Sequence, residues 1–377
     1  MTGPSEDCLR QGETADFIQP LLEQILGRSL IGGPQDEHRE VLSACRILVT
    51  GAGGSIGTAL SRWLALIAPK SLVLVDNHEN SLFRLMQELA QPNVPLRPEF
   101  VLADVRNSQR IGQLVRESRP DIVFHLAAYK HVPIAELWPA EFVQTNLIAT
   151  FDLALAAAST GVRKIVYTST DKAVNPPSIY GATKRAAEIA LQAVDQMLET
   201  RITIVRLVNV LGARGGVIEA FARNAAAGQP LRITDPKMSR YWITLPEALH
   251  LLAAAACHPS SGILLPDAGP PLNIVEMAKA VWRAIRGTED GFQAEFTGVR
   301  PGERLSEELV YPYESLRSSR TQGVLEVAYN SGITSPSLDE VAERLSLLKR
   351  LADAGDSTEL RKQLFTFISA CNQAGPP

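Results

Sequence analysis

A glycine-rich turn between an apolar strand and a helix is the feature that most constrains this fold. Residues 46–50 (RILVT) are typical of a buried strand, and residues 58–68 are typical of a helix. The turn between them, GAGGSIG at 51–57, has glycine at every third position. The first glycine allows a tight turn, the second lets backbone N–H groups approach a pyrophosphate, and the third lets the helix pack on the strand. The pattern predicts a dinucleotide site; a merely flexible loop is the alternative.

The strand ends supply the rest of this expected site. The phosphates would lie at the positive N-terminus of the helix, against Gly51, Gly54, Ser55, Ile56 and Gly57. Asp76 ends the strand at 71–75, about 20–25 residues after the first glycine, where a carboxylate accepts hydrogen bonds from the adenosine ribose. That carboxylate would repel a 2′-phosphate and favours NAD, although Arg84 nearby leaves NADP open. A helix N-cap is the alternative role for Asp76.

Three further segments carry candidate cofactor residues. Asp104 and Val105 follow the strand at 98–102, where the carboxylate would meet an adenine amino group or serve only as a turn aspartate. The small residues Ala127 and Ala128 end the strand at 121–128 and leave room for a cofactor. Asn146 lies on the long helix predicted at 142–160.

Strands alternate with helices along this half of the chain, with a helix at 111–119, a strand at 164–168 and a further strand at 202–208. This βαβ alternation predicts the α/β class, with a doubly wound parallel sheet of the Rossmann type.

The stretch from Ser169 to Lys184 carries the acid–base chemistry. Tyr180 and Lys184 are four residues apart and share one face of a predicted helix, so the ammonium would lower the pKa of the phenol. This pair suits a general base or acid for an alcohol. Thr170 could hydrogen-bond the same substrate oxygen, and Asp171 and Lys172 add a second acid–base pair. Taken alone, Tyr-x-x-x-Lys is a weak signal, because most instances are ordinary helix starts. A simple salt bridge in a turn is the alternative for Asp171 and Lys172.

The second half of the chain predicts a smaller substrate lobe. A polar loop covers 209–216, and short strands and loops of this lobe are expected at 231–234, 235–241 and 262–265, with helices at 217–227, 246–257 and 273–286. Arg240 and the basic turn that begins at Arg300 suit a diphosphate, because guanidinium groups match phosphate oxygens. A solvated surface arginine is the alternative for each.

The expected domain boundaries follow from these elements. Residues 1–45 form an extension that is disordered at 1–15 and has a short amphipathic helix at 17–27, packed on the main domain or on a neighbouring subunit. Residues 46–208 form the dinucleotide-binding domain. Residues 209–335 form mainly the substrate lobe, with some chain returning to the large sheet, and 336–377 form C-terminal helices.

Composition narrows the function classes. The 377 residues are 45% hydrophobic and 21% charged, as in a globular protein with a sizeable core. A net charge of −4 argues against a nucleic-acid partner. No apolar run approaches ~18 residues, so no membrane span is expected. Cysteines 8, 45, 257 and 371 form no metal-binding pattern, and no metal site is expected. Free thiols and a polar N-terminus favour a cytoplasmic location.

Several segments together resemble a known family. The glycine turn, Tyr180-x-x-x-Lys184 and the βαβ alternation are similar to extended short-chain dehydrogenases/reductases that act on nucleotide sugars. More narrowly, the chain resembles the polysaccharide-biosynthesis branch typified by UDP-N-acetylglucosamine 4,6-dehydratases. The segments that carry this resemblance are HLAAYKHVP at 125–133, STDKAV at 169–174, MSRYWIT at 238–244 and RPGE at 300–303. It runs from about residue 20 to about residue 370. Some family members are membrane-anchored, and this chain resembles their soluble catalytic part.

The resemblance implies a reaction on a UDP-sugar with a tightly bound NAD (or NADP) that is recycled within the site. Tyr180 would remove the 4-hydroxyl proton, with Thr170 on the C4 oxygen, as C4 is oxidised. Lys172 would then remove the C5 proton while Asp171 protonates the departing 6-hydroxyl, and hydride would return to C6. The product is a 4-keto-6-deoxy sugar, with or without inversion at C5. The resemblance also assigns substrate contacts to Lys130, Asn209, Arg240 and Arg300, with Lys130 near the cofactor edge as well.

Two other functions stay open at this stage. A 4-epimerase or ketoreductase of the same fold needs Tyr180 and Lys184 but has no use for Asp171 and Lys172. A non-catalytic dinucleotide sensor would not need a low-pKa tyrosine. The sugar's 2-substituent is not fixed by the sequence, and the family resemblance implies self-association into a homo-oligomer.

Overall fold

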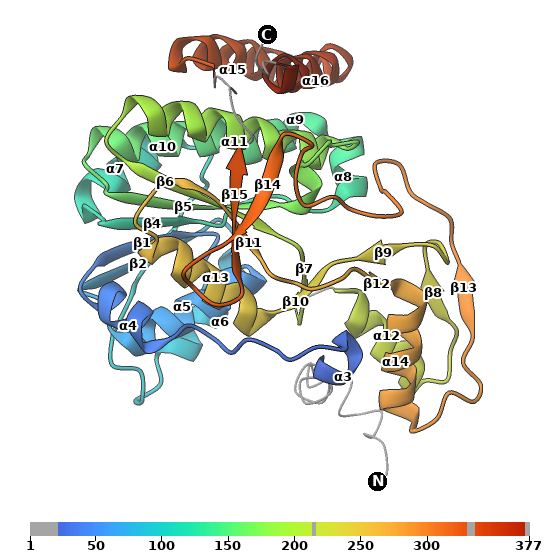
Figure 1. Cartoon of the computed structure of the whole chain (residues 1–377). Coiled ribbons are helices and arrows are strands. Elements are labelled where there is room, and N and C mark those ends of the chain that lie inside the picture. Colours follow the sequence, from blue (N-terminus) through green and yellow to red (C-terminus); the bar gives the residue numbers. More distant parts are fainter. Residues whose placement is uncertain (1–21, 213–215, 330–335, 374–377) are drawn as a thin grey trace.

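The computed structural model describes residues 22–212, 216–329 and 336–373. A large sheet with helices on both faces forms the main body, and a smaller lobe lies beside it (Figure 1). The expected disorder at 1–15, the start of the helix expected at 17–27 and part of the polar loop at 209–216 lie outside the described residues.

Across the described residues, the large sheet has nine strands in the order β14-β15-β11-β6-β5-β4-β1-β2-β3. The strands from β11 to β3 are mutually parallel, and the β14–β15 hairpin adds antiparallel to β11 at one edge. Their bounds are β1 Arg46–Thr50, β2 Ser71–Asp76, β3 Glu99–Leu102, β4 Ile122–His125, β5 Lys164–Thr170, β6 Arg201–Leu207, β11 Gly262–Pro266, β14 Glu314–Ser318 and β15 Val324–Tyr329. The central strands are continuous apolar runs because helices bury both faces of the sheet.

The assignment of residues 262–265 to the small lobe was wrong. These residues form β11, which pairs in parallel with β6 in the large sheet. A short strand of Gly, Ile and Leu residues carries no local mark of the sheet it joins, since its pairing partner lies about 60 residues away in the chain.

Two helical layers cover the sheet (Figure 1). One apolar core lies under α7, α10 and α11, with α15 and α16 beyond them. The other lies under α4, α5, α6 and α13. Their bounds are α4 Asp36–Ser43, α5 Ser55–Ile67, α6 Glu79–Leu89, α7 Ser108–Ser118, α10 Ala149–Ser159, α11 Ile179–Met197, α13 Leu245–Cys257, α15 Leu338–Asp353 and α16 Ser357–Gln373.

The long helix predicted at 142–160 begins earlier and is not uniform. It comprises α9 (Pro139–Phe142), a π-helical turn η2 (Val143–Ile148) and α10. Within the described residues, this 21-residue stretch is long and apolar enough to cross a membrane, which the sequence-based expectation overlooked. Its apolar window is 67% buried inside the protein, as in a core helix.

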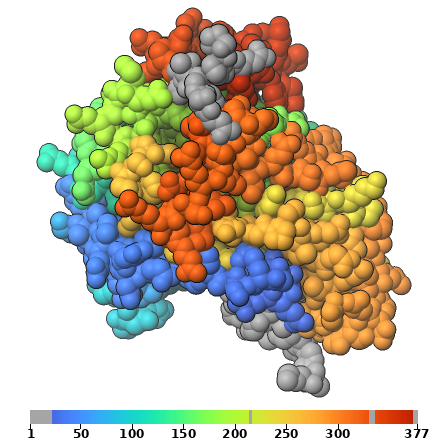
Figure 2. Space-filling model, in the orientation of Figure 1, coloured from blue at the N-terminus to red at the C-terminus, as the bar shows by residue number. Residues whose placement is uncertain are grey.

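The small lobe has its own apolar core and three two-stranded sheets in the described residues. Its elements are β7 Asn209–Leu211, α12 Val217–Ala226, β8 Leu231–Ile233, β9 Ser239–Arg240, β10 Trp242–Thr244, β12 Leu272–Asn273, α14 Ile274–Arg286 and β13 Ala294–Phe296. The N-terminal helix α3 (Leu22–Leu26) packs into this lobe beside α14. Figure 2 shows that N-terminal segment in blue against the orange lobe.

The chain therefore passes repeatedly between the two parts. It leaves the sheet after β6, returns for α13 and β11, leaves again for β12 to β13, and returns for β14 and β15. The lobe lies at the carboxyl ends of the parallel strands, which is where ligands bind in open α/β sheets.

Candidate active site

The glycine turn packs closely against the protein backbone around it. Gly51 has φ +70°, and a Cβ there would lie 2.6 Å from the backbone nitrogen of Ala127. A Cβ on Gly57 would lie 2.0 Å from the carbonyl oxygen of Gly51. Helix α5 starts at Ser55 after Gly54 as N-cap, so the amides of its first turn, including that of Ile56, open at the carboxyl edge of the sheet.

Asp76 is tied to this turn by two hydrogen bonds. Its Oδ2 accepts from the backbone N–H of Gly53 at 2.8 Å, and its Oδ1 accepts from that of His78 at 2.8 Å. The alternative N-cap role is not seen, because His78 caps α6 by accepting from the N–H of Ser81. Arg84 is exposed and donates to the carbonyl of Asn80 in its own helix.

Asp104 is held by its own turn. Its carboxylate accepts from the Arg106 side chain at 2.7–3.1 Å and from the Arg106 backbone N–H at 2.9 Å. The Arg106 guanidinium lowers the pKa of this carboxyl. An adenine amino group would have to share the carboxylate with Arg106. The neighbouring Val105 is buried in the core.

A buried histidine that the sequence reasoning left without a role fixes the strand ends here. His125 Nδ1 lies 2.7 Å from Thr50 Oγ1 and its Nε2 lies 2.9 Å from Thr150 Oγ1. Burial lowers the pKa of His125 to about 3, so it is a neutral structural group. This network aligns β1 and β4, after which the chain passes through the half-buried Ala127 and Ala128 beside the glycine turn.

Asn146 was predicted to contact the cofactor, but its polar atoms form hydrogen bonds within the protein. Its Oδ1 accepts from the backbone N–H of Tyr129 at 2.9 Å, and its Nδ2 donates to the Tyr129 carbonyl at 2.9 Å and to Thr183 Oγ1 at 3.3 Å. The side chain is fully buried. Asn146 therefore positions the segment after β4 against α11. Lys130, next in that segment, is exposed.

The expected catalytic residues come together where β5 ends. Thr170 Oγ1 donates to Asp171 Oδ1 at 2.9 Å, and Asp171 and Lys172 begin the one-turn helix η3 (Asp171–Ala173). Helix α11 starts directly beside this turn, with Ser178 as its N-cap and Tyr180 in its first turn. Asp171 Oδ2 is buried and has no hydrogen-bond partner among the described residues.

The expected electrostatics of Tyr180 and Lys184 were wrong for the protein alone. Burial raises the pKa of Tyr180, and the groups that oppose this shift are Lys172 and the Thr170 hydroxyl. Lys184 is directed elsewhere: its Nζ donates to the Thr168 carbonyl at 2.6 Å. Burial lowers the pKa of Lys184 to about 7. Sequence spacing places both residues on one helix face, but it does not reveal that desolvation dominates the pKa of each side chain.

Lys172, rather than Lys184, is the lysine that contacts acids in this cluster. Its Nζ lies 3.0 Å from Asp171 Oδ1 and 3.6 Å from Glu307 Oε1. Burial alone would lower the pKa of Lys172, but Asp171 and Glu307 outweigh burial and raise it. The charged form of Lys172 is therefore favoured in the resting protein.

One cavity joins this cluster to the small lobe. Its wall contains Lys172 together with Asn209, Arg240 and Arg300, three of the four residues predicted to contact substrate. Lys130 is not part of the wall. Arg300 is exposed, whereas Arg240 is buried and donates to the carbonyls of Ser239, Arg304 and Leu305, and Asn209 Nδ2 donates to the Tyr241 carbonyl at 3.0 Å. Arg240 thus holds the 300–307 segment as well as lining the cavity.

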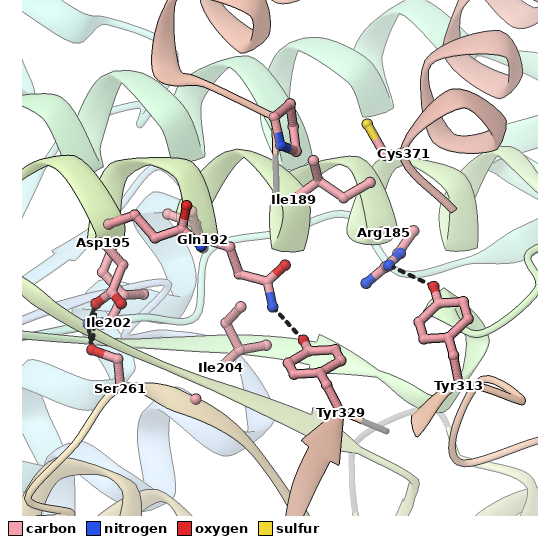
Figure 3. A pocket seen from close by; sticks show the side chains of 14 residues that line it. Arg185, Ile189, Gln192, Asp195, Ile202, Ile204, Ser261, Tyr313, Tyr329 and Cys371 are labelled. Atoms are coloured by element: carbon pink, nitrogen blue, oxygen red, sulfur yellow. Dashed lines mark hydrogen bonds between the residues drawn. The ribbon is translucent and has the colours of Figure 1, made fainter. Parts of the chain in front are cut away.

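A separate groove lies between α11 and the sheet edge and contains none of the predicted site residues. Figure 3 shows Arg185 bonded to Tyr313 and Gln192 bonded to Tyr329 along it. Nearby, Arg206 forms fully buried ion pairs with Glu188 and Glu314, and Glu188 also accepts from Ser169. This network supports β5 next to the turn that carries Asp171 and Lys172. Among the described residues, no group of three or more His, Cys, Asp or Glu side chains could hold a metal ion.

Known proteins are similar to this chain over most of its length. The family described as "Polysaccharide biosynthesis protein" matches residues 47–328. The capsular polysaccharide biosynthesis protein CapD of Staphylococcus aureus is 40% identical over 293 residues, which cover 77% of this chain and 49% of CapD. The chain thus spans about half the length of that relative.

Two further relatives are named for different reactions. A UDP-N-acetylglucosamine 4,6-dehydratase (inverting) of Campylobacter jejuni is 30% identical over 269 residues, covering 70% of this chain and 77% of the relative. A UDP-glucose 4-epimerase of Rickettsia canadensis is 33% identical over 274 residues, with the same two coverages. Among solved structures, Pen from Bacillus thuringiensis is similar with a TM-score of 0.69 and 28% identity, covering 81% of this chain and 97% of Pen.

Proposed function

The chain belongs to the polysaccharide biosynthesis family of extended short-chain dehydrogenases/reductases, and from this premise we propose that it is a nucleotide-sugar 4,6-dehydratase. The substrate proposed is a UDP-N-acetylhexosamine, with UDP-N-acetylglucosamine as the first choice. The observation that carries the proposal is the Asp171–Lys172 pair beside Tyr180, because Lys172 of this pair lies in the wall of the cavity that also holds Arg240 and Arg300.

The residues of the glycine turn fit a dinucleotide. Side chains at Gly51 or Gly57 would fill the space that the close approach of loop, helix and strand requires. Asp76 stands at the end of β2 beside this turn, and its charge disfavours a 2′-phosphate, so NAD is proposed over NADP. When bound, NAD would supply the hydride acceptor at C4 and the hydride donor at C6, and it would be recycled within each turnover.

The protein's own groups account for the elimination of water. Lys172 passes its proton to Asp171 across their 3.0 Å contact, which leaves a neutral amine and a neutral carboxyl group. The amine takes the C5 proton, made acidic by the 4-ketone, and Asp171 gives its proton to the departing 6-hydroxyl, which leaves as water. The ammonium and carboxylate of the resting pair are thereby restored. Thr170 and Tyr180 would hold the C4 oxygen.

An experiment in deuterated water tests this assignment. The pure protein is incubated with UDP-N-acetylglucosamine, and the product is analysed by mass spectrometry and NMR. Loss of one water with deuterium at C5 is the expected result. Lys172→Met should abolish C5 exchange, whereas Lys362→Met, at an exposed position on α16, should not. If no water is lost from this substrate, from UDP-glucose or from dTDP-glucose, the proposal is wrong.

A 4-epimerase or ketoreductase is the second candidate, because the 33%-identical Rickettsia relative is named a UDP-glucose 4-epimerase. The same incubation separates the two functions, since an epimerase yields an isomer of unchanged mass without deuterium at C5. A cytoplasmic location and a homo-oligomer are part of the proposal. Fractionation and light scattering test them.

A further inference from the structure

Glu307 is a buried carboxylate with no predicted role, and it lies between two cations of the cavity wall, Lys172 and Arg240. Glu307 lies in the segment between β13 and β14, and its side chain is only 5% exposed. Its Oε1 lies 3.6 Å from Lys172 Nζ and 3.7 Å from Arg240 Nε. Both distances are those of ion pairs rather than of hydrogen bonds. One oxygen thus faces the acid–base pair and the arginine of the small lobe together.

The charge of Glu307 acts on the step that the proposed function assigns to Lys172. When the amine of Lys172 takes the C5 proton, a positive charge develops on its nitrogen. A fixed carboxylate close to that nitrogen stabilises the charge as it forms, and the effect is strongest in a site shielded from water. Asp171 cannot supply this stabilisation throughout the step, because it is neutral until it releases its own proton to the 6-hydroxyl.

We propose that Glu307 is a positioning residue for the elimination step, holding Lys172 beside Asp171 and stabilising the ammonium that forms there. The inference rests on the proposed dehydratase function. Through Arg240, the same carboxylate also fixes the acid–base pair relative to the lobe. Arg240 in turn donates to the carbonyls of residues 304 and 305, so the segment that carries Glu307 is itself held in place.

Other charged and titratable groups face this cluster and bear on the test. From the same turn comes Asp171, from α11 comes Tyr180, and from β9 comes Arg240. Further charged groups in the cavity wall are Arg232, Arg300 and Glu303. Of these groups, Asp171 and Glu307 are the two acids within ion-pair distance of Lys172 in the described residues.

The charge-removing variant is Glu307→Gln, which keeps the shape of the side chain. Its matched control is Glu308→Gln, because Glu308 is the next residue but is exposed and bonds to Asn175. Glu307→Asp keeps the charge with a shorter reach and serves if the glutamine variant does not fold. Circular dichroism confirms that each variant is folded before it is measured.

The first readout does not depend on turnover. Lysine labelled with ¹³C at Cε is titrated by NMR, and the Lys172 signal is identified by its loss in Lys172→Arg. Because Glu307 helps to raise the pKa of Lys172, Glu307→Gln should make this lysine titrate about one pH unit lower. Glu307→Asp and Glu308→Gln should leave it near the wild-type value. An unchanged titration in Glu307→Gln would overturn the inference.

The second readout is the pH profile of water loss. In the proposed active form, Lys172 and Asp171 share one proton. The fall of kcat at alkaline pH therefore reports the loss of this proton from Lys172. In Glu307→Gln this limb should move to lower pH and kcat should fall about tenfold, with KM little changed. An equal fall at every pH would indicate a purely structural role and would also overturn the inference. If the wild-type protein loses no water from any sugar, the dehydratase proposal fails, while the NMR titration still decides the role of Glu307.

Discussion

Gly181 packs directly against the carbonyl oxygen of Lys172, where a Cβ would lie only 2.1 Å from that oxygen. Helix α11 therefore begins in contact with the turn that carries the acid–base pair. Tyr180, the preceding residue, is placed by this contact. The position of the Tyr180 phenol relative to Asp171 and Lys172 thus depends on the absence of a side chain at Gly181.

The variant Gly181→Ala should separate the two groups. The added methyl group must push α11 from the turn, and a displacement of about 1 Å can cost roughly 100-fold in rate. We expect kcat to fall by about that factor while dinucleotide binding persists. Gly32→Ala is the matched control, because nothing lies within 4 Å of a Cβ there. Equal kcat in the two variants would show that the contact does not position Tyr180.

Tyr180→Phe removes the phenol and keeps the ring. If the phenol exchanges a proton with the 4-hydroxyl, turnover should fall about 10²- to 10⁴-fold. NAD binding, measured by calorimetry, should stay within about twofold of the wild-type value. Tyr129→Phe, at an exposed tyrosine, is the control. Loss of NAD binding in Tyr180→Phe would contradict the catalytic role.

Gly57→Ala addresses the glycine turn. A Cβ 2.0 Å from the Gly51 carbonyl oxygen must move α5 away from the loop that would hold the phosphates. NAD should bind at least about tenfold more weakly, which corresponds to about 1.4 kcal/mol. Calorimetric titration beside Gly33→Ala, which meets no neighbour, measures the difference. Unchanged affinity would place the dinucleotide elsewhere.

Asn146→Ala tests the buried amide that holds the segment after β4. The change leaves the N–H and carbonyl of Tyr129 without their partners, at a cost of about 1–3 kcal/mol in unfolding free energy. Urea denaturation measures this loss. The control is Gln144→Ala, in the same π-helical turn, whose amide bonds to Asp353 at the exposed side. A stable Asn146→Ala protein with weak NAD binding would restore the direct cofactor contact predicted from the sequence.

Arg206→Met should make stability depend on pH in the opposite sense to the wild type. Burial would raise the pKa of Glu188, but Arg206 outweighs burial and lowers it, so this pair stabilises the fold above about pH 4.5 and less as pH falls further. Without Arg206, only Arg185 and the Ser169 hydroxyl oppose burial, so the pKa of Glu188 should rise, and unfolding at pH 7 should become easier by about 3–5 kcal/mol. That deficit should shrink at pH 5, where Glu188 can be protonated.

Urea denaturation at pH 5 and pH 7 measures the effect of Arg206→Met. Arg62→Met is the control, because its ion pair with Glu88 is half-exposed and contributes at most about 1 kcal/mol. The same deficit at both pH values would show that Glu188 keeps its low pKa without Arg206.

Local signals in the sequence carried much of the fold and part of the candidate site. Patterns of only a few residues predicted the glycine turn, the apolar strands and the helix start at Tyr180. In the structure, the turn and the helix start lie at one edge of the sheet that these strands form. One cavity brings together four residues from distant segments, Lys172, Asn209, Arg240 and Arg300, and Asp171 contacts Lys172. Their meeting was inferred from resemblance rather than from spacing.

What the sequence could not give depends on contacts across long separations. Glu307 meets Lys172 from 135 positions away, and nothing in its own neighbourhood marks it as buried. Asn146 was predicted as a cofactor residue, but its partners are the backbone groups of Tyr129 and the Thr183 hydroxyl, which no local pattern can reveal. The raised pKa of Tyr180 follows from desolvation, a property of the packed protein.

The interrupted course of the chain has a consequence for engineering and for how such enzymes acquire new substrates. The small lobe is contributed by the N-terminal helix and by two separate stretches, 209–244 and 272–296, with α13 and β11 of the large sheet between them. A chimera joined at a single junction would include only one of the two stretches, and the apolar core of the lobe would then be incomplete. Relatives should therefore acquire different substrate preferences by separate point substitutions at residues that line the cavity. A designed chimera should exchange both stretches together.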